Sequence, residues 1–494
     1  MKQAGQRSFT ACYSLSCLLA ALLLASCGVE SESGGKNERP LNVLFILSDD
    51  QAPDTIRAYG NENISTPSLD TLVADGMSFT YVFNQGSWSG AVCAPSRRMI
   101  NTGRHLYHTG MDPRRDHQQD YPVMGETFRT AGYDTFQTGK WHLPMDVWKR
   151  SFTHGSAVFK GGMSRYENGG HLDTTFSNYN PDSTSGNEFT DYKAGKHSSE
   201  EIAEAAVEFL SRRSETSNPF MMYVAFLAPH DPRQPTADSV AEYPQEEMVL
   251  PANFLKFHPF DQGDYYLRDE VLAGFPRSEK VVREAISDYY AMITHMDAQV
   301  GRILAALEES GQADNTLIIF TSDHGLAMGS HGLMGKQNAY DHSVRAPFIV
   351  KGPGVPAGAS APGMFYLNSV FPTAADMAGL EIPDTVEAPS VAPLIQGEKD
   401  TAYDSLYGGY RHFQRMVRTL DYKLIYYPMI ERTQLFDLRV DPGETNDLSG
   451  DPAEAERITA MMQELEGWKD TIGDPLTNDD PQRSFGAFLG LTWK

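Results

Sequence analysis

The chain has 494 residues, with 65 Asp and Glu against 41 Lys and Arg, and a formal net charge of −24 at pH 7. This acidity argues against a nucleic-acid-binding protein, because binding to phosphates needs clustered Lys and Arg. It does not exclude a small anionic substrate, whose binding depends on the local field in a cleft. The length exceeds that of a usual single domain and is ample for a large hydrophobic core.

The N-terminus has the pattern of a bacterial export signal. An apolar run over 15–25 is too short to span a membrane, and Leu24-Ala25-Ser26-Cys27 is typical of a lipoprotein cleavage site. Residues 1–27 are interpreted as a lipoprotein signal peptide and lipobox, which predicts an exported protein held by a lipid on Cys27, on the periplasmic side of a bacterial membrane or at the cell surface. Residues 28–40 are polar, as in a flexible tether. The alternative is a cleaved signal peptide without lipid.

The body of the chain alternates apolar runs with amphipathic segments. Continuous Val, Leu, Ile and Phe runs predict buried strands over 42–47, 133–138, 220–227, 316–321 and 346–350. Helical periodicity with start and stop residues predicts helices over 66–74, 124–131, 198–213 and 279–310. This alternation predicts an α/β domain over 41–400, with a large, mixed, mostly parallel sheet sandwiched by helices.

The pattern of apolar and aromatic residues changes after about residue 400, and residues 401–494 are expected to form a smaller C-terminal α+β subdomain. Its aromatic-rich part over 403–427 predicts two strands, Leu435–Leu438 a third, and 454–469 a helix. Two other stretches lack periodicity, and we expect them to be irregular and to shape a binding site; they are residues 145–195 and 231–278.

Cys93 is the cysteine that the export interpretation leaves without a partner, because the other three cysteines lie within residues 1–27. It opens the sequence Cys93-Ala94-Pro95-Ser96-Arg97, followed by Thr102-Gly103-Arg104. This resembles the maturation motif of the formylglycine-dependent sulfatases, in which the cysteine becomes an aldehyde that serves as the nucleophile. For the motif alone the alternative is a buried structural cysteine, since free cysteine is among the most buried residue types.

Polar residues recur where the predicted strands end, and in an open α/β sheet ligands bind at the carboxyl ends of the strands. We therefore expect these residues to share one site; they are Asp49 and Asp50, Lys140 and His142, His230, and Asp323 and His324. The three aspartates are hard oxygen donors suited to Ca²⁺ or Mg²⁺. Arg97, Lys140 and Lys336 can surround a sulfuryl group and compensate charge as oxygen leaves. The two histidines His142 and His230 can move protons near neutral pH.

The resemblance to the sulfatase family extends from residue 41 to about 450. It includes Thr138-Gly139-Lys140-Trp141-His142, Thr321-Ser322-Asp323-His324-Gly325, Gly335-Lys336-x3-Tyr340-x4-Arg345-Ala346-Pro347 and Leu435-Phe436-Asp437-Leu438. It implies an alkaline phosphatase-like fold with a catalytic domain over 41–400, similar to bacterial iduronate-sulfatase-like and choline-sulfatase-like members.

The resemblance also implies roles for individual residues. The metal, Ca²⁺ or alternatively Mg²⁺, would be held by Asp49, Asp50, matured Cys93, Asp323 and His324, although many members have Asn at the last position, which leaves His324 as a ligand or as a neighbour of one. Matured Cys93 (3-oxoalanine, or formylglycine) would attack sulfur, Lys140 and Lys336 would bind sulfate oxygens, and His230 or Lys336 would protonate the leaving alcohol. Arg97 would hold the hydrated aldehyde, and His142 would take a proton from its second hydroxyl to expel sulfate.

The sequence therefore predicts a sulfuric ester hydrolase that acts on a sulfated carbohydrate, with a role in polysaccharide degradation, and that depends on a formylglycine-generating or anaerobic maturing enzyme. Arg104, His105 and Arg233 are candidates for contacts to the sugar. Two alternatives remain open: a phosphonate or phosphate monoester hydrolase of the same superfamily, and a non-enzymatic surface lipoprotein that binds sulfated glycans.

Overall fold

The computed structural model describes residues 39–109, 121–183, 187–214 and 217–476, so the predicted signal peptide and most of the predicted tether lie outside it. The strands of its large sheet are β1 (Asn42–Asp49), β2 (Met77–Phe83), β4 (Asp134–Lys140), β5 (His154–Phe159), β6 (Thr175–Tyr179), β7 (Phe189–Lys193), β8 (Phe220–Pro229), β9 (Thr316–Ser322), β10 (Arg345–Lys351) and β11 (Ala359–Tyr366). Their order is β11-β2-β10-β9-β1-β8-β4-β5-β6-β7.

Strand β1 lies in the middle of this sheet and is buried on both faces. It pairs in parallel with β8 on one side and with β9 on the other. Its side chains alternate, because Phe45 and Leu47 join the hydrophobic core on one face, whereas Leu44 and Ile46 join the core on the opposite face. Each such side chain contributes about 1.5–3 kcal/mol when fully buried, so both cores fix the register of β1 and the place where its polar end emerges.

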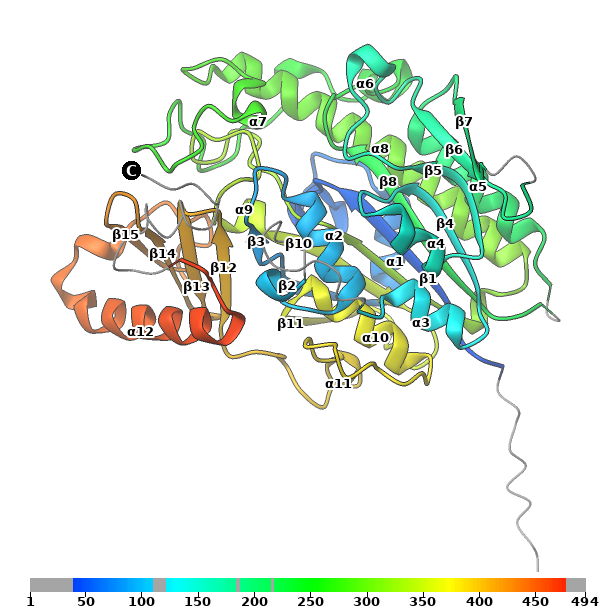
Figure 1. The fold of residues 1–494 in the computed structure, drawn as a ribbon. Helices are drawn as coiled ribbons and strands as arrows, with labels where there is room; N and C mark the ends of the chain where they lie inside the picture. The colour runs from blue at the N-terminus through cyan, green and yellow to red at the C-terminus, as the bar shows by residue number, and fades with distance from the viewer. Residues whose placement is uncertain (1–38, 110–120, 184–186, 215–216, 477–494) are drawn as a thin grey trace, which may run out of the picture. The chain divides into compact units, whose positions relative to one another are not determined.

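Helices cover both faces of the large sheet (Figure 1). One face packs against α1 (Pro67–Asp75), α5 (Ser198–Ser211) and α8 (Glu279–Glu309). The other packs against α2 (Cys93–Thr102), α3 (Met124–Thr130), α4 (Met145–Ser151), α10 (Val370–Met377) and α11 (Ala392–Ile395). Within the described residues, no helix combines the length and the apolar character needed to cross a membrane.

The sheet is mixed and mostly parallel, as predicted, and β10 runs antiparallel to both of its neighbours, β2 and β9. One expectation needs correction. Residues 145–195 are less irregular than expected, because they contain α4 and the strands β5, β6 and β7, which extend the sheet. Strands β6 and β7 keep several side chains exposed, so they lack the apolar runs that identified the central strands. The Pro-rich residues 231–278 contain only the short helices α6 (Ala237–Ala241) and α7 (Arg268–Val271) and are otherwise without α-helix or strand.

The C-terminal subdomain is built on a second, five-stranded sheet of order β15-β14-β13-β12-β3. Its own strands are β12 (Leu406–Tyr410), β13 (Gln414–Arg418), β14 (Tyr422–Tyr427) and β15 (Arg432–Asp437), so residues 403–427 hold three strands where two were expected, and α12 (Ala455–Ile472) packs on them. The fifth strand, β3 (Gly86–Ser87), comes from the segment before Cys93 and pairs in parallel with β12. A Cβ atom at Gly86 would lie 2.0 Å from the carbonyl oxygen of Gly409, so glycine is needed for this close approach.

Candidate active site

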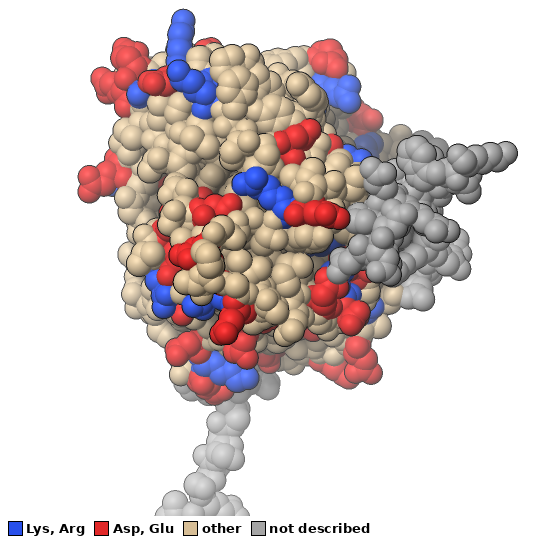
Figure 2. Space-filling view, turned by 90° about the vertical axis from the view of Figure 1, so that its left-hand side faces the viewer, with Lys and Arg blue, Asp and Glu red and all other residues tan. Residues whose placement is uncertain are grey.

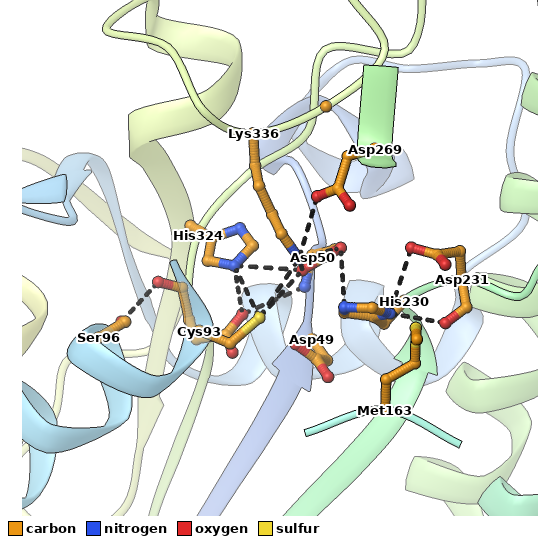
Figure 3. A network of polar contacts seen from close by, with 12 residues as sticks. Asp49, Asp50, Cys93, Ser96, Met163, His230, Asp231, Asp269, His324 and Lys336 are labelled. Carbon is orange, nitrogen blue, oxygen red and sulfur yellow. Dashed lines mark hydrogen bonds and ion pairs between the residues drawn. The ribbon is translucent and has the colours of Figure 1, made fainter. Parts of the chain in front are cut away.

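The predicted site residues converge at the carboxyl ends of four adjacent parallel strands, β9, β1, β8 and β4 (Figure 3). Asp49 is the last residue of β1, Lys140 is the last residue of β4, His230 follows β8, and Asp323 follows β9. Adjacent parallel strands bring their carboxyl ends to one edge of the sheet, and the structure confirms that these residues gather there.

Asp50 adopts a strained backbone conformation, with φ of 69°. Its amide donates to Asp323 Oδ1 at 3.2 Å, and its carbonyl accepts a hydrogen bond from the hydroxyl of Tyr289 at 2.5 Å. A non-glycine residue with positive φ is held only where its surroundings fix it. These contacts fix it here, and they turn the carboxylate of Asp50 toward Cys93.

Cys93 is the first residue of α2, and its buried sulfur lies at the centre of the cluster (Figure 3). Its Sγ atom is 3.3 Å from Lys336 Nζ, 3.4 Å from His324 Nε2 and 3.7 Å from Asp50 Oδ1. Burial raises the pKa of the unmodified thiol well above its ordinary value, and the charge of Asp49 adds to this shift. The unmodified cysteine is therefore held as a thiol, which is a poor nucleophile.

Arg97, one turn along α2 from Cys93, ties three strand ends together. Its Nε lies 3.0 Å from Asp323 Oδ2, its Nη1 donates to the carbonyl of Lys140 at 2.8 Å, and its Nη2 is 3.8 Å from Asp49 Oδ1. The side chain is fully buried; burial opposes its charge, but Asp323 and Asp49 outweigh that effect and raise its pKa. Arg97 thus stays charged and holds two of the carboxylates in place.

The three carboxylates of the cluster are matched by three cations. Lys140 Nζ contacts Asp49 Oδ2, and Lys336 Nζ lies 2.7 and 2.8 Å from the two carboxylate oxygens of Asp50. Burial by itself would raise the pKa of the Asp50 carboxyl, but the charges of His230, Lys336 and His324 outweigh it and lower that pKa. All three carboxylates are therefore ionised, and the protein itself balances their charge.

Five residues of the cluster form a group that can hold a cation. One ligand atom from each of Asp49, Asp50, Cys93, Asp323 and His324 lies within 4.8 Å of all the others. Asp49 Oδ1 is buried and finds no hydrogen-bond partner among the described residues. Buried polar atoms almost always have a partner, and a cation bound in this group would supply one. The donor set, rich in carboxylate oxygen, suits Ca²⁺ or Mg²⁺.

Two histidines flank the cluster. The Nδ1 atom of His230 lies 2.6 Å from the carbonyl of Asp231 and must donate to it, which leaves Nε2 turned toward Asp50 Oδ2 at 3.8 Å. His142 has φ of 59°, and its buried Nδ1 has no hydrogen-bond partner within the described chain. Burial, followed by the charge of Lys140, lowers the pKa of His142 to about 2. His142 is therefore neutral.

An ionic network beside His230 escaped the sequence analysis. Arg268 Nη2 lies 2.9 Å from Asp231 Oδ1 and 2.7 Å from Asp269 Oδ1, and Asp269 Oδ2 lies 4.0 Å from Lys336 Nζ. The position of Asp231 directly after His230 could have indicated its place. Arg268 and Asp269 gave no signal, because α7 is a four-residue helix inside an aperiodic stretch.

The three predicted sugar-contact residues lie in different places. Arg104 pairs with Glu387 at 2.8 Å, and the buried His105 bonds with Gln85 at 2.7 Å. Both follow the C-terminal end of α2, a helix about 15 Å long, so they lie far from Cys93 and are engaged by protein groups. Arg233, by contrast, lines a cavity next to Asp231.

Comparisons with known proteins agree with this geometry. The profile of the family described as Sulfatase matches residues 41–380, and that described as N-sulphoglucosamine sulphohydrolase, C-terminal, matches residues 329–471. The N-acetylglucosamine-6-O-sulfatase of Bacteroides thetaiotaomicron is 26% identical over 551 aligned residues, which cover 96% of this chain and 93% of that protein.

Solved structures share the fold. One, described as being in complex with its substrate D-glucosamine-2-N,6-O-disulfate, has a TM-score of 0.73 at 23% identity and covers 90% of this chain and 100% of its own. The phosphonate monoester hydrolase of Agrobacterium radiobacter has a TM-score of 0.69 at 21% identity, covering 87% and 96%. These likenesses confirm the alkaline phosphatase-like architecture. The Sulfatase profile matches more than half of this chain, so the chain belongs to the sulfatase family and is a sulfatase, a sulfuric ester hydrolase.

Proposed function

We propose that this sulfatase removes sulfate from a sulfated saccharide, using matured Cys93 as its nucleophile and a divalent cation held by the surrounding carboxylates. The observation that carries the proposal is the place of Cys93 Sγ, 3.3 Å from Lys336 Nζ and among the possible metal ligands. The relatives support the saccharide, since one is named an N-acetylglucosamine-6-O-sulfatase and another structure is described with a sulfated glucosamine as substrate.

The charge of the site favours an anionic substrate although the chain as a whole is acidic. On the face drawn in Figure 2, Lys and Arg side chains are interspersed with Asp and Glu. At the site, by contrast, Arg97, Lys140 and Lys336 already neutralise the three aspartates. A divalent cation would be held by Asp49, Asp50, Asp323 and His324 beside matured Cys93, and its excess positive charge would polarise a sulfate oxygen. We propose Ca²⁺ as this cation, with Mg²⁺ as the alternative.

The other steps of the reaction are assigned to side chains of the protein. Matured Cys93, as a hydrated aldehyde, supplies a hydroxyl for attack and a second hydroxyl for later release of sulfate. Lys140 and Lys336 donate to sulfate oxygens as negative charge develops, and Arg97 orients the attacking group and holds Asp323. His230 turns its Nε2 toward the site and delivers a proton to the leaving alcohol oxygen.

His142 is suited to the opposite transfer. Its imidazole is kept neutral by burial and by Lys140, so it can accept the proton of the second hydroxyl. A bound sulfate ester brings negative charge next to this ring and favours its protonation. The restored aldehyde then begins a new cycle.

Export and anchoring belong to the same proposal. Leu24-Ala25-Ser26-Cys27 supports a lipid-anchored protein on the periplasmic side or at the surface of a bacterial membrane. Maturation of Cys93 requires an enzyme of the producing cell that generates formylglycine.

Mass spectrometry of the peptide that contains Cys93, on protein from a host with a maturing enzyme, tests the nucleophile. We expect oxygen in place of sulfur at this residue, and sulfate release that is absent in Cys93→Ala. Retention of the thiol in a host that matures other sulfatases would refute the proposed nucleophile. Parallel assays on aryl sulfate and aryl phosphonate esters test the reaction, and faster turnover of the phosphonate would favour the alternative monoester hydrolase.

A further inference from the structure

A cavity of about 630 Å³ adjoins the candidate active site. Asp231 and Arg233, which follow His230 in the chain, line it together with Met163 and Met334. Figure 3 shows Met163 and Asp231 beside His230. The volume falls within the range of about 300–1,000 Å³ that small-molecule sites occupy. A substrate whose ester oxygen reaches His230 therefore has room here for the rest of its ring.

Three arginines line the cavity; Arg165 is largely exposed, and the other two differ in how they are paired. Arg268 is engaged, because it contacts both carboxylate oxygens of Asp231 and lies 2.7 Å from Asp269. Arg233 is partly buried, and the described residues give it no hydrogen bond and no ion pair; its Nε atom is buried and without an acceptor. A guanidinium has five N–H donors and no acceptor. A buried donor without a partner lowers the stability of the folded protein. Arg233 can therefore donate to an oxygen atom of a bound molecule, since no described residue supplies one.

An acceptor faces the same space. Asp288, on α8, also lines the cavity, and Arg233 is close enough to influence its pKa but not within ion-pair distance. Burial raises the pKa of Asp288, and the charge of Arg233 only partly offsets that effect. The guanidinium of Arg233, a donor, and the carboxylate of Asp288, an acceptor, thus line one cavity without contacting each other.

We propose that this cavity binds the sugar residue that bears the sulfate ester, and that Arg233 and Asp288 recognise its hydroxyl groups. Arg233 donates to one hydroxyl oxygen, and Asp288 accepts a hydrogen bond from a neighbouring hydroxyl. A vicinal pair of hydroxyls supplies both an acceptor and a donor, which neither a carboxylate nor a second sulfate does. Arg233 is then a specificity-determining residue. This inference rests on the proposed sulfatase action on a saccharide.

Hydroxyls fit the cavity better than a second anionic group does. Four acidic residues (Glu167, Asp231, Glu284 and Asp288) and three arginines (Arg165, Arg233 and Arg268) line it, so the cavity lacks the excess of positive charge that a second anionic group would need. The exposed ring of Tyr166 stands among the lining residues. Its apolar face can pack on the C–H groups of a sugar.

The test compares two substrates in each variant, N-acetylglucosamine 6-sulfate and 4-nitrophenyl sulfate, the second of which lacks sugar hydroxyls. We expect Arg233→Ala to lower kcat/KM for the sulfated sugar by about 10- to 100-fold, as for a lost hydrogen bond to a charged group. Turnover of the aryl sulfate should stay near the wild-type value. Asp288→Asn should also lower the ratio of kcat/KM for the sulfated sugar to kcat/KM for the aryl sulfate. Arg233→Lys should restore that ratio only in part, because Lys lacks the planar, multiply donating guanidinium group.

Arg165→Ala is the matched control, since Arg165 lines the same cavity but is 65% exposed and lies 3.7 Å from Glu167. An unchanged substrate ratio in Arg233→Ala, or an equal loss on both substrates, would overturn the inference. If the wild-type enzyme releases sulfate from neither substrate class, the proposed function fails, and the inference fails with it.

Discussion

Lys336 places its Nζ atom 2.7 Å from Asp50 Oδ1 and 3.3 Å from Cys93 Sγ, so a single ammonium group joins a carboxylate to the candidate nucleophile. The side chain is buried, and although burial opposes its charge, the surrounding acidic groups, Asp50 first among them, together outweigh that effect and raise its pKa well above its ordinary value. Lys336 therefore remains a fixed positive charge beside the candidate nucleophile, where the proposed mechanism places the sulfate group.

We expect Lys336→Ala to lower kcat by about 10²- to 10³-fold, as for loss of one preorganised donor to a transition state. Lys336→Arg should recover little, because the larger planar group does not fit the same short contacts. Steady-state kinetics on an aryl sulfate, with the Cys93 peptide checked for maturation, gives the measurement. Lys351→Ala removes a lysine of a partly exposed ion pair with Asp75 and serves as the control. A Lys336→Ala enzyme within threefold of wild type would contradict this role.

Metal removal should abolish turnover without unfolding the protein. The carboxylates of Asp49, Asp50 and Asp323 remain neutralised by Arg97, Lys140 and Lys336 after the ion leaves, so no uncompensated buried charge remains. We expect the melting temperature to fall by several degrees at most, since loss of an ion present at 100 times its Kd removes about 2.7 kcal/mol.

Activity after chelation and after stepwise addition of Ca²⁺ or Mg²⁺, together with thermal melts, measures both effects. Chelator already saturated with Ca²⁺ is the control. Full activity in protein shown by elemental analysis to be metal-free would exclude the proposed cation.

Gly162 gives a second test, directed at His142. A Cβ atom at Gly162 would lie 2.4 Å from His142 Nε2, whereas one at Gly161 would meet only the far end of the Phe159 ring at 3.2 Å. Gly162→Ala must therefore displace the imidazole, and misplacement of a reacting group by about 1 Å can cost about 10²-fold. We expect a fall in kcat for Gly162→Ala with little change in melting temperature, and near-wild-type kinetics for Gly161→Ala. Equal kinetics in the two variants would remove His142 from the mechanism.

The sequence was most informative where one physical rule governed both fold and site. Apolar runs identified the central strands β1, β8 and β9, because strands buried on both faces need no polar alternation. The polar residues after them, such as Asp49 and Asp323, then had to meet at one edge. Strands β6 and β7 were missed because their side chains remain partly exposed, so they lack a continuous apolar run.

The outer part of the site could not be derived in the same way. Arg104 and His105 follow the cysteine motif in sequence, but α2 carries them away from Cys93 toward Glu387. Arg268 and Asp269 come from an aperiodic stretch and reach the site only through tertiary packing. The rule that strand ends meet at one edge therefore predicted the reacting core of the site, whereas nearness to the cysteine motif in the sequence failed for the residues around it.

His105 links the end of α2 to the C-terminal subdomain and should make stability depend on pH. It is 8% exposed and packs edge-on against Trp468. The side-chain oxygen of Gln85 accepts a hydrogen bond from the backbone amide of Leu106. The side-chain nitrogen of Gln85 therefore donates to His105 Nδ1, at 2.7 Å. This bond requires an unprotonated Nδ1, and burial lowers the pKa of His105 from 6.5 to about 4, with Glu387 opposing and His108 and Arg104 adding to the shift.

The sign of the effect follows from proton uptake. Between about pH 6.5 and 4 the unfolded chain binds a proton at this residue and the folded chain does not, so the free energy of unfolding falls as the pH falls through that window. The contribution of His105 is at most about 3 kcal/mol. It is fully present above pH 6.5 and is lost on acidification, down to about pH 4.

We expect the free energy of unfolding of His105→Gln, measured by denaturant titration at several pH values, to fall less steeply over this range than that of the wild type. Other buried histidines titrate in both proteins, so the difference between the two curves isolates His105. Parallel curves for His105→Gln and wild type would show that protonation of His105 does not destabilise this junction.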